Sequence, residues 1–387
     1  MTARFAGTGV ARSKVADAAA LDASLAALEA AGTDHADLAL VFVTADAFPR
    51  AHEALHAVRR VTGARAVVGC SGAGVLTERG EIEDGSAVAV LVVQDDRFVM
   101  SPVLLEDLDA GDGDAGSRLA QRTADVMLTG GTVVVLPDAR GLDPRTLLGR
   151  FDDALGFVPV VGAVAAGAPL FELFGTDAAE GALAALAVGG PEPVVGVAQG
   201  CMPIGEPYVI TRADGQLIET IGGRPALDVL KEAITRVDGG PERVQRAGMF
   251  AGLAMDPAKS PLERGDFLVR NLVGADRSTG AIAVGEPVRV GQTIQFQIRD
   301  AESARLDLRA TLDGVARELA GRRPMFGCYF NCAGRGQGLF GVPDHDVGMI
   351  RERLGAFPLV GFFGNGEFAP IGRRNYFHTY TGVLAVF

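Results

Sequence analysis

Two thiols, an amide and an arginine gather where a glycine-rich segment follows an apolar run of this 387-residue chain. The segment is CYFNCAGRG, and it contains Cys328, Asn331, Cys332 and Arg335. A thiol beside a general base can act as a nucleophile, and a guanidinium can hold a carboxylate through two parallel hydrogen bonds. Because ligands often bind where the strands of an α/β sheet open into loops, we interpret these four residues as a candidate ligand site.

A second segment, GFFGNGEF, adds Asn365 and the carboxylate Glu367 to the candidate site. Arg335 and Glu367 would offer opposite charges across one cavity, which would suit a zwitterion such as an amino acid. Capping of loop amides is the alternative role for Glu367. His378 stands among aromatic residues and can act as a ligand residue or a base, although a histidine held by hydrogen bonds is more common.

An earlier segment, GCSGAG, places Cys70 and Ser71 in a corresponding loop, where an inert buried thiol is the alternative role for Cys70. A zinc site could be assembled from the thiols of CYFNC and the later histidines, but that spacing matches no recognised knuckle. The sequence contains no complete phosphate loop, nucleophile elbow or HExxH motif. We therefore expect a binding protein without a cofactor or metal, and not an enzyme.

The segments that must position these residues follow one plan three times. They are VTGARAVVGCSGAGV, LGFVPVVGAVAAGAP and LGAFPLVGFFGNGEF, which begin at Val61, Leu155 and Leu354. In each segment a first glycine is expected to end a helix in the left-handed conformation. A second glycine is expected where a strand meets a loop, so that the backbone can bend or another group can approach. The two sets are Gly63, Gly156 and Gly355, and Gly69, Gly162 and Gly361.

Each plan predicts a strand, a helix, a second strand, a loop and a closing strand. The expected strands are 38–44, 64–69 and 87–93 in unit one, 132–136, 158–162 and 182–188 in unit two, and 325–330, 358–361 and 382–387 in unit three. Short crossovers predict that the first two strands of a unit pair in parallel and that the third is antiparallel. The expected fold class is α/β with mixed sheets, helices outside and a layered αββα arrangement as one option. Sheets packed face to face and one large sheet both fit.

Other segments give local predictions. Residues 14–31 are expected to form an amphipathic helix with Val15, Leu21, Leu25 and Leu28 on one side. Pro49 is expected to open the helix of unit one, and 106–114 reads as an acidic linker. Residues 208–220 predict a hairpin, and 293–299 predict a strand with one face in solvent.

Composition limits the function classes. The formal net charge is −12 with an isoelectric point near 5.0, and no basic stripe is present, so a nucleic-acid partner is not expected. Four cysteines in so long a chain indicate reduced thiols. The N-terminal segment has no apolar signal core, and the uncharged stretch 154–171 contains prolines and glycines that favour buried core over a membrane span. We expect a soluble, cytoplasmic protein.

Three longer segments resemble the FIST family (F-box and intracellular signal transduction proteins). They are QGCMPIGEPYVITRADGQLIETIGGRPALDVL, RNLVGADRSTGAIAVGEPVRVGQTIQFQIRD and the terminal GEFAPIG…FHTYTGVLAVF, and the early GCSGAG resembles the start of the family's N-terminal domain. The resemblance spans about residues 36–387. It implies a FIST N-terminal domain at 35–220 and a FIST C-terminal domain at 221–387, and the helix expected from apolar spacing precedes them at 1–34.

The resemblance implies a sensory module that binds small molecules such as amino acids. The family's first loop often continues with an acidic residue, and Val75 occupies that place here. No kinase, cyclase or F-box segment accompanies the FIST segments, which implies a separate signalling partner. Two alternatives stay open: a thiol-dependent enzyme using Cys328 or Cys332 with His378, and a haem-based gas sensor, because some relatives are reported to carry haem. The ligand, the partner and the oligomeric state are not specified by the sequence.

Overall fold

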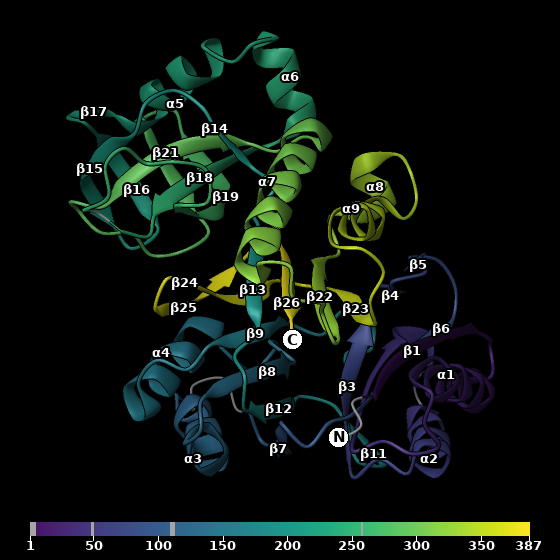
Figure 1. Cartoon of the computed structure of the whole chain (residues 1–387). Coiled ribbons are helices and arrows are strands. Elements are labelled where there is room, and N and C mark those ends of the chain that lie inside the picture. The colour runs from purple at the N-terminus through teal and green to yellow at the C-terminus, as the bar shows by residue number, and fades with distance from the viewer. Residues whose placement is uncertain (1–4, 48–49, 109–112, 257) are drawn as a thin grey trace. The chain divides into compact units, whose positions relative to one another are not determined.

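A computed structural model describes residues 5–47, 50–108, 113–256 and 258–387. It is a mixed α/β protein with 29% helix and 38% strand, which confirms the predicted fold class (Figure 1). The expected helix start at Pro49 and part of the acidic segment 106–114 lie outside the described residues.

The chain forms two compact units. The larger unit comprises Met1–Val197, Thr311–Phe377 and Thr381–Phe387, and the smaller comprises Ala198–Ala310 and His378–Tyr380. The smaller unit is therefore inserted, in sequence, into the third repeat of the larger one.

The larger unit contains three repeats with one element order, namely strand, helix, strand, helix, strand, hairpin and closing strand, except that two helices stand at the second helix position of repeat three. Repeat one consists of β1 (Phe5–Arg12), α1 (Ala16–Ala31), β2 (Leu38–Thr44), α2 (Ala51–Thr62), β3 (Ala66–Gly72), β4 (Val75–Thr77), β5 (Gly80–Ile82) and β6 (Ala87–Gln94). Repeat two consists of β7 (Val99–Leu105), α3 (Ala115–Met127), β8 (Gly131–Pro137), α4 (Pro144–Leu155), β9 (Val160–Ala163), β10 (Glu172–Phe174), β11 (Asp177–Ala179) and β12 (Leu183–Gly189).

Repeat three begins with β13 (Val194–Ala198) and resumes after the insertion. It continues through α7 (Ala301–Leu319), β22 (Gly327–Cys332), α8 (Gly336–Phe340), α9 (His345–Leu354), β23 (Leu359–Gly364), β24 (Glu367–Ile371), β25 (Arg374–His378) and β26 (Gly382–Val386). Residues 301–310 of α7 and His378 of β25 belong to the smaller unit. In each repeat the first two predicted strands pair in parallel and the closing strand is antiparallel, as predicted. The predicted units lacked the strand and helix that open each repeat, because β1 and β7 have mixed polar and apolar residues.

The three repeats form three six-stranded sheets, not one large sheet. Each sheet receives the hairpin of another repeat: β4 pairs with β23, β10 with β3, and β24 with β9, all antiparallel. The hairpins therefore link the three repeats in a cycle. Nothing in a hairpin's own sequence specifies which sheet it joins.

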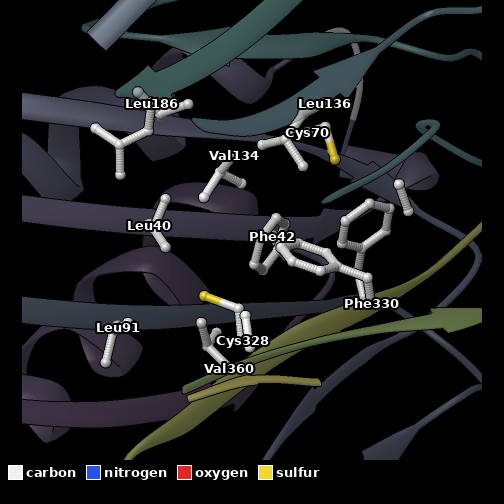
Figure 2. Close-up of a cluster of buried hydrophobic side chains, with 14 of the residues drawn as sticks. Leu40, Phe42, Cys70, Leu91, Val134, Leu136, Leu186, Cys328, Phe330 and Val360 are labelled. Carbon is white, nitrogen blue, oxygen red and sulfur yellow. The ribbon is translucent and has the colours of Figure 1, made fainter. Parts of the chain in front are cut away.

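The inner faces of the three sheets share one apolar core. Its members include Leu40 and Phe42 on β2, Val134 and Leu136 on β8, and Phe330 on β22 (Figure 2). The outer faces of the first two sheets are covered by helices, which pack on residues such as Val41 and Val135. Because both faces of these strands are buried, they read as continuous apolar runs in the sequence.

The repeated glycines have the two roles that their spacing predicted. Gly63, Gly156 and Gly355 end α2, α4 and α9 with positive φ, of 63°, 71° and 81°. Only Gly63 has the predicted left-handed helical conformation, because ψ is −164° at Gly156 and 176° at Gly355. The second set allows close backbone approach. A Cβ on Gly69, Gly162 or Gly361 would lie 1.6, 1.9 or 1.8 Å from a carbonyl oxygen of the parallel strand beside it.

Helix α1 exists as predicted, but its predicted apolar face was wrong in part, since Leu28 is buried and two of the other predicted residues are exposed. Val15, before the helix, and Leu25 are 48% and 52% exposed, whereas Ala19, Ala23 and Ala27 are fully buried. The reason is the neighbouring β1, whose glycines come so close that a Cβ there would lie 2.0–2.4 Å from the helix backbone. Only alanine-sized residues fit such an interface.

The smaller unit is a closed antiparallel barrel with helices beside it. Its ring runs β15, β16, β20, β19, β18 and β21, and β21 pairs with both β15 and β18. The unit's elements are β14 (Met202–Pro203), β15 (Tyr208–Asp214), β16 (Leu217–Ile221), β17 (Arg224–Pro225), α5 (Ala226–Thr235), α6 (Gly240–Ala247), β18 (Met249–Ala254), β19 (Phe267–Asp276), β20 (Ala281–Val284) and β21 (Thr293–Ile298). The predicted hairpin is β15–β16, but the one-sided exposure predicted for β21 was wrong, since Gln295 and Gln297 are buried too.

Candidate functional site

The candidate residues of repeat three surround a buried ion pair. Arg335 follows β22, and its Nε lies 2.8 Å from Oδ2 of Asp346 on α9, with Nη2 at 3.2 Å from Oδ1. Both side chains are 0% exposed. The fork of Arg335 that could hold a ligand carboxylate is therefore engaged with a carboxylate of the protein itself.

Asp346 is the centre of this polar cluster. Its carboxylate also accepts hydrogen bonds from the Tyr329 hydroxyl at 2.9 Å and the Asn331 amide at 3.2 Å. Burial would raise the pKa of Asp346, but the Arg335 guanidinium and the His345 ring outweigh burial and hold that pKa below its usual range. The ion pair is thus charged and close to neutral in total.

Glu367 begins β24 and is fully buried in the same repeat. Its Oε2 accepts the backbone N–H of Thr381 at 3.1 Å, whereas its Oε1 has no hydrogen-bond partner among the described residues. Burial raises the pKa of Glu367 to about 8, and the neighbouring Arg335 and the Cys332 thiol, which hydrogen-bonds to the carboxyl, offset only part of that rise. In the described part of the chain the Oδ1 atom of Asn331 is likewise a buried acceptor without a partner.

A second buried carboxyl, Glu172, occupies the matching position in repeat two. It pairs with Cys70 on β3, as Glu367 pairs with Ala163 on β9. Its Oε2 accepts the N–H of Ala182 at 3.4 Å, and within the described residues its Oε1 has no partner. Burial, aided by the charge of the nearby Asp138, raises the pKa of Glu172 to about 9.

The remaining candidate residues of the larger unit have different surroundings. Cys70 faces the core beside Glu172, and burial raises the pKa of its thiol. Ser71 is buried, and its Oγ accepts the N–H of Phe171 at 3.1 Å. Asn365 is exposed, and its N–H donates to the carbonyl of Val164. Cys70 and Ser71 thus lie beside Glu172 and Phe171 of repeat two.

Cys328 lies in the shared apolar core, as Figure 2 shows, and burial raises the pKa of its thiol to about 12. A thiol in these surroundings stays protonated at neutral pH and is a poor nucleophile. The thiol-dependent enzyme therefore draws no support from Cys328.

His378 belongs to the smaller unit and exposes only 2% of its surface. An axial haem ligand must present a ring nitrogen to the iron beside a flat porphyrin, so an imidazole enclosed in this way does not fit that group. In the described part of the chain, no three His, Cys, Asp or Glu side chains are grouped to hold a metal ion.

Sequence reasoning missed Glu172 and Asp346. The repeat spacing marks the position of Glu367, which stands six residues after Gly361, as Val75 stands six residues after Gly69. The same spacing does not lead to Glu172. Glu172 stands ten residues after Gly162, since the loop is longer there. Asp346 carries no sequence signal, because an acidic residue near a helix start is ordinarily a solvated cap.

Two family models match the chain: a FIST N domain over residues 37–224 and a FIST C domain over residues 226–370. An uncharacterized protein of Mycobacterium tuberculosis is 35% identical over 387 residues, covering 98% of this chain and 99% of the relative. An uncharacterized protein of Mycobacterium bovis is 36% identical over 379 residues, covering 95% and 96%. No helix of the described residues is both long and apolar enough to span a membrane.

Solved structures show more distant likenesses. A chorismatase has a TM-score of 0.36 at 10% identity, with 100% of this chain and 99% of that chain covered. A cyanuric acid hydrolase has a TM-score of 0.31 at 10% identity, with both chains fully covered. Likenesses this distant carry no argument about chemistry.

Proposed function

Because the chain belongs to the FIST family, whose domains are associated with sensory signal transduction, we propose that it is a sensor of a small metabolite. The proposed ligand is an amino acid or a similar small molecule, and the proposed site is the polar cluster of repeat three. The proposed setting is the cytoplasm, where a separate protein would receive the signal.

One observation carries the choice of site. Glu367 is fully buried, yet its Oε1 accepts no hydrogen bond from the described residues. A buried acceptor without a partner costs about 1–3 kcal/mol, so native proteins rarely keep one without a water, an ion or a ligand to satisfy it. The Oδ1 atom of Asn331 adds a second acceptor of the same kind.

The surroundings of these acceptors select the ligand's chemistry. Arg335 is neutralised by Asp346, so the cluster has no cation in excess to hold Glu367 in its ionised form. A ligand with an amino group would supply both the N–H donors and the positive charge. Arg335 could bind a ligand carboxylate only if Asp346 gave up one of its two hydrogen bonds to the guanidinium.

Thermal unfolding with a panel of amino acids tests the proposal. A ligand that binds only the folded chain stabilises it by about 2.7 kcal/mol when the free ligand concentration is one hundred times the Kd. This stabilisation raises Tm by several degrees. We expect at least one amino acid to raise Tm, and Glu367→Gln to abolish the rise. Glu180→Gln, which changes an exposed carboxyl, is the matched control. A panel that leaves Tm unchanged rejects this ligand class.

The signalling partner needs its own experiment. The tagged full chain is isolated from cells with and without the active amino acid, and the proteins that accompany it are compared. We expect one protein whose recovery depends on the ligand and is lost in the Glu367→Gln variant. Recovery that ignores both the ligand and the variant would contradict a sensory role at this site.

A further inference from the structure

Glu172 and Glu367 are equivalent residues of the internal repeat. Each begins the first strand of its hairpin, and each pairs with the residue that follows the second glycine of another repeat, Gly69 or Gly162. The third equivalent is Val75, which pairs with Phe362 directly after Gly361. These three positions face the shared core in the same way.

The two carboxyls also share one backbone hydrogen bond, although only Glu367 has a thiol, that of Cys332, bound to it as well. In each, Oε2 accepts one backbone N–H from the residue just before the closing strand of the same repeat, Ala182 or Thr381. In each, Oε1 has no hydrogen-bond partner among the described residues, and the side chain is 0% exposed. The same unsatisfied atom thus occurs twice, on two different sheets.

Each carboxyl also lies near an arginine that already has a partner of its own. Arg140 binds Asp138 through its Nε at 2.9 Å and 3.1 Å from the two carboxylate oxygens, and Arg335 binds Asp346. These pairs leave no net positive charge for the neighbouring glutamate. The other titratable neighbours are thiols, Cys70 at Glu172 and Cys332 at Glu367, and neither supplies a cation.

We propose that the larger unit has two binding positions for a protonated primary amine, at Glu172 and at Glu367, related by the internal repeat. A primary ammonium group supplies the missing charge and up to three N–H donors, which matches a buried carboxylate oxygen without a partner. A metal ion is a poorer match, because it requires several protein ligands and the described residues offer no such group. For Glu367 the inference deepens the proposed sensor site, whereas Glu172 stands on its own contacts.

Amine binding exchanges a proton for the ammonium group. Burial leaves both carboxyls protonated at pH 7, with pKa values of about 9 for Glu172 and about 8 for Glu367. When the ammonium group binds, the O–H bond breaks, the carboxylate keeps the electron pair, and the proton leaves to solvent. Each occupied position should therefore release about one proton.

Carbon-13 NMR of the full chain, labelled at the glutamate carboxyl carbons, follows this exchange directly. Methylammonium chloride is the probe, and tetramethylammonium chloride, a cation without N–H donors, is the control at the same ionic strength. The variants Glu172→Val and Glu367→Val assign the carboxyl signals of these two residues. Valine is chosen because Val75 occupies the equivalent position in repeat one. Glu172→Gln and Glu367→Gln serve as isosteric second variants if a valine variant fails to fold.

Burial also raises the pKa of Glu81 to about 8, so one carboxyl signal at the protonated position should belong to that residue. At pH 7 we expect the Glu172 and Glu367 signals at the protonated position as well. Methylammonium should move both to the ionised position, and tetramethylammonium should move neither. If methylammonium leaves both signals unchanged, a water or no ligand satisfies the oxygens and the proposal is wrong. If only the Glu367 signal moves, the second position is wrong and the sensor site stands. If both move while no amino acid raises Tm, the amine positions stand and the proposed sensor function fails.

Discussion

Replacing Glu172 by glutamine should change how stability depends on pH, not only its value. The glutamine has the shape of the protonated acid but cannot release a proton. In the native protein, burial raises the pKa of Glu172 to about 9 from an ordinary value of 4.5. The folded state therefore keeps this proton between those two pH values, whereas the unfolded state has released it.

The sign and size follow from proton linkage. Stability falls as pH rises wherever the folded state binds more protons than the unfolded state, at about 1.4 kcal/mol per pH unit for one proton. The contribution of Glu172 is thus fully present below about pH 4.5 and is lost progressively up to about pH 9. Between pH 5 and pH 8 the native protein should lose about 4 kcal/mol relative to the glutamine variant.

Urea unfolding at a series of pH values measures this difference. The chain has no tryptophan, so circular dichroism at 222 nm is the appropriate signal. Other groups that titrate, such as Asp346 with its lowered pKa, act in both proteins and cancel in the difference. Glu180→Gln, in which the replaced carboxyl is exposed, should show a difference from the native protein that hardly varies with pH.

A difference between the native protein and Glu172→Gln that stays flat from pH 5 to pH 9 would refute the reasoning. It would mean that the carboxyl has a partner that keeps it ionised in the folded state. A difference that falls as pH rises would have the opposite sign and would point to a buried cation beside Glu172.

Three further predictions concern other parts of the larger unit. Gly361→Ala should destabilise the fold by more than about 3 kcal/mol in urea unfolding, because the new Cβ would lie 1.8 Å from a backbone oxygen. The control Gly149→Ala, on an open helix surface, should stabilise the fold by about 0.5–1 kcal/mol. Equal effects of the two variants would contradict the close approach at Gly361. Arg335→Met should lower the free energy of unfolding by about 3–5 kcal/mol at pH 7, since it leaves the Asp346 carboxylate buried and unpaired. This loss of stability should shrink at low pH. A loss below about 1 kcal/mol would show that the ion pair is dispensable. The Cys328 thiol should resist a thiol reagent in the folded protein and react after unfolding, and rapid labelling of the native chain at this residue, located by mass spectrometry, would contradict its burial.

The parts of the fold that depend on local geometry could be predicted from the sequence. Gly63 and Gly355 end helices as expected, because only a residue without a Cβ adopts that backbone conformation at no cost. Parallel pairing of β2 with β3 followed from their apolar runs and the short crossover between them. The exchange of hairpins could not be predicted, because the strand that β10 or β24 joins is fixed by long-range packing.

The candidate site divides in the same way. The position of Glu367 at a strand end was visible in the spacing of the repeat, whereas the environment of Arg335 was not. An arginine in a glycine-rich loop is exposed more often than buried, and here α9 brings Asp346 onto it. Residues that are brought together by different elements leave no mark in either local sequence. The proposal of a domain boundary between 220 and 221 stays a prediction.

The valine of repeat one is the strongest reason to assign the two carboxyls to function. Val75 is fully buried at the equivalent position, so this fold accepts an apolar side chain there. A buried valine contributes about 1.5–3 kcal/mol, whereas a glutamate with a folded pKa of about 9 forfeits about 3 kcal/mol at pH 7. Glu172→Val should therefore raise the stability of the unliganded protein at pH 7. A protein that keeps the less stable residue at two of three equivalent positions has a use for a carboxyl there that packing does not explain.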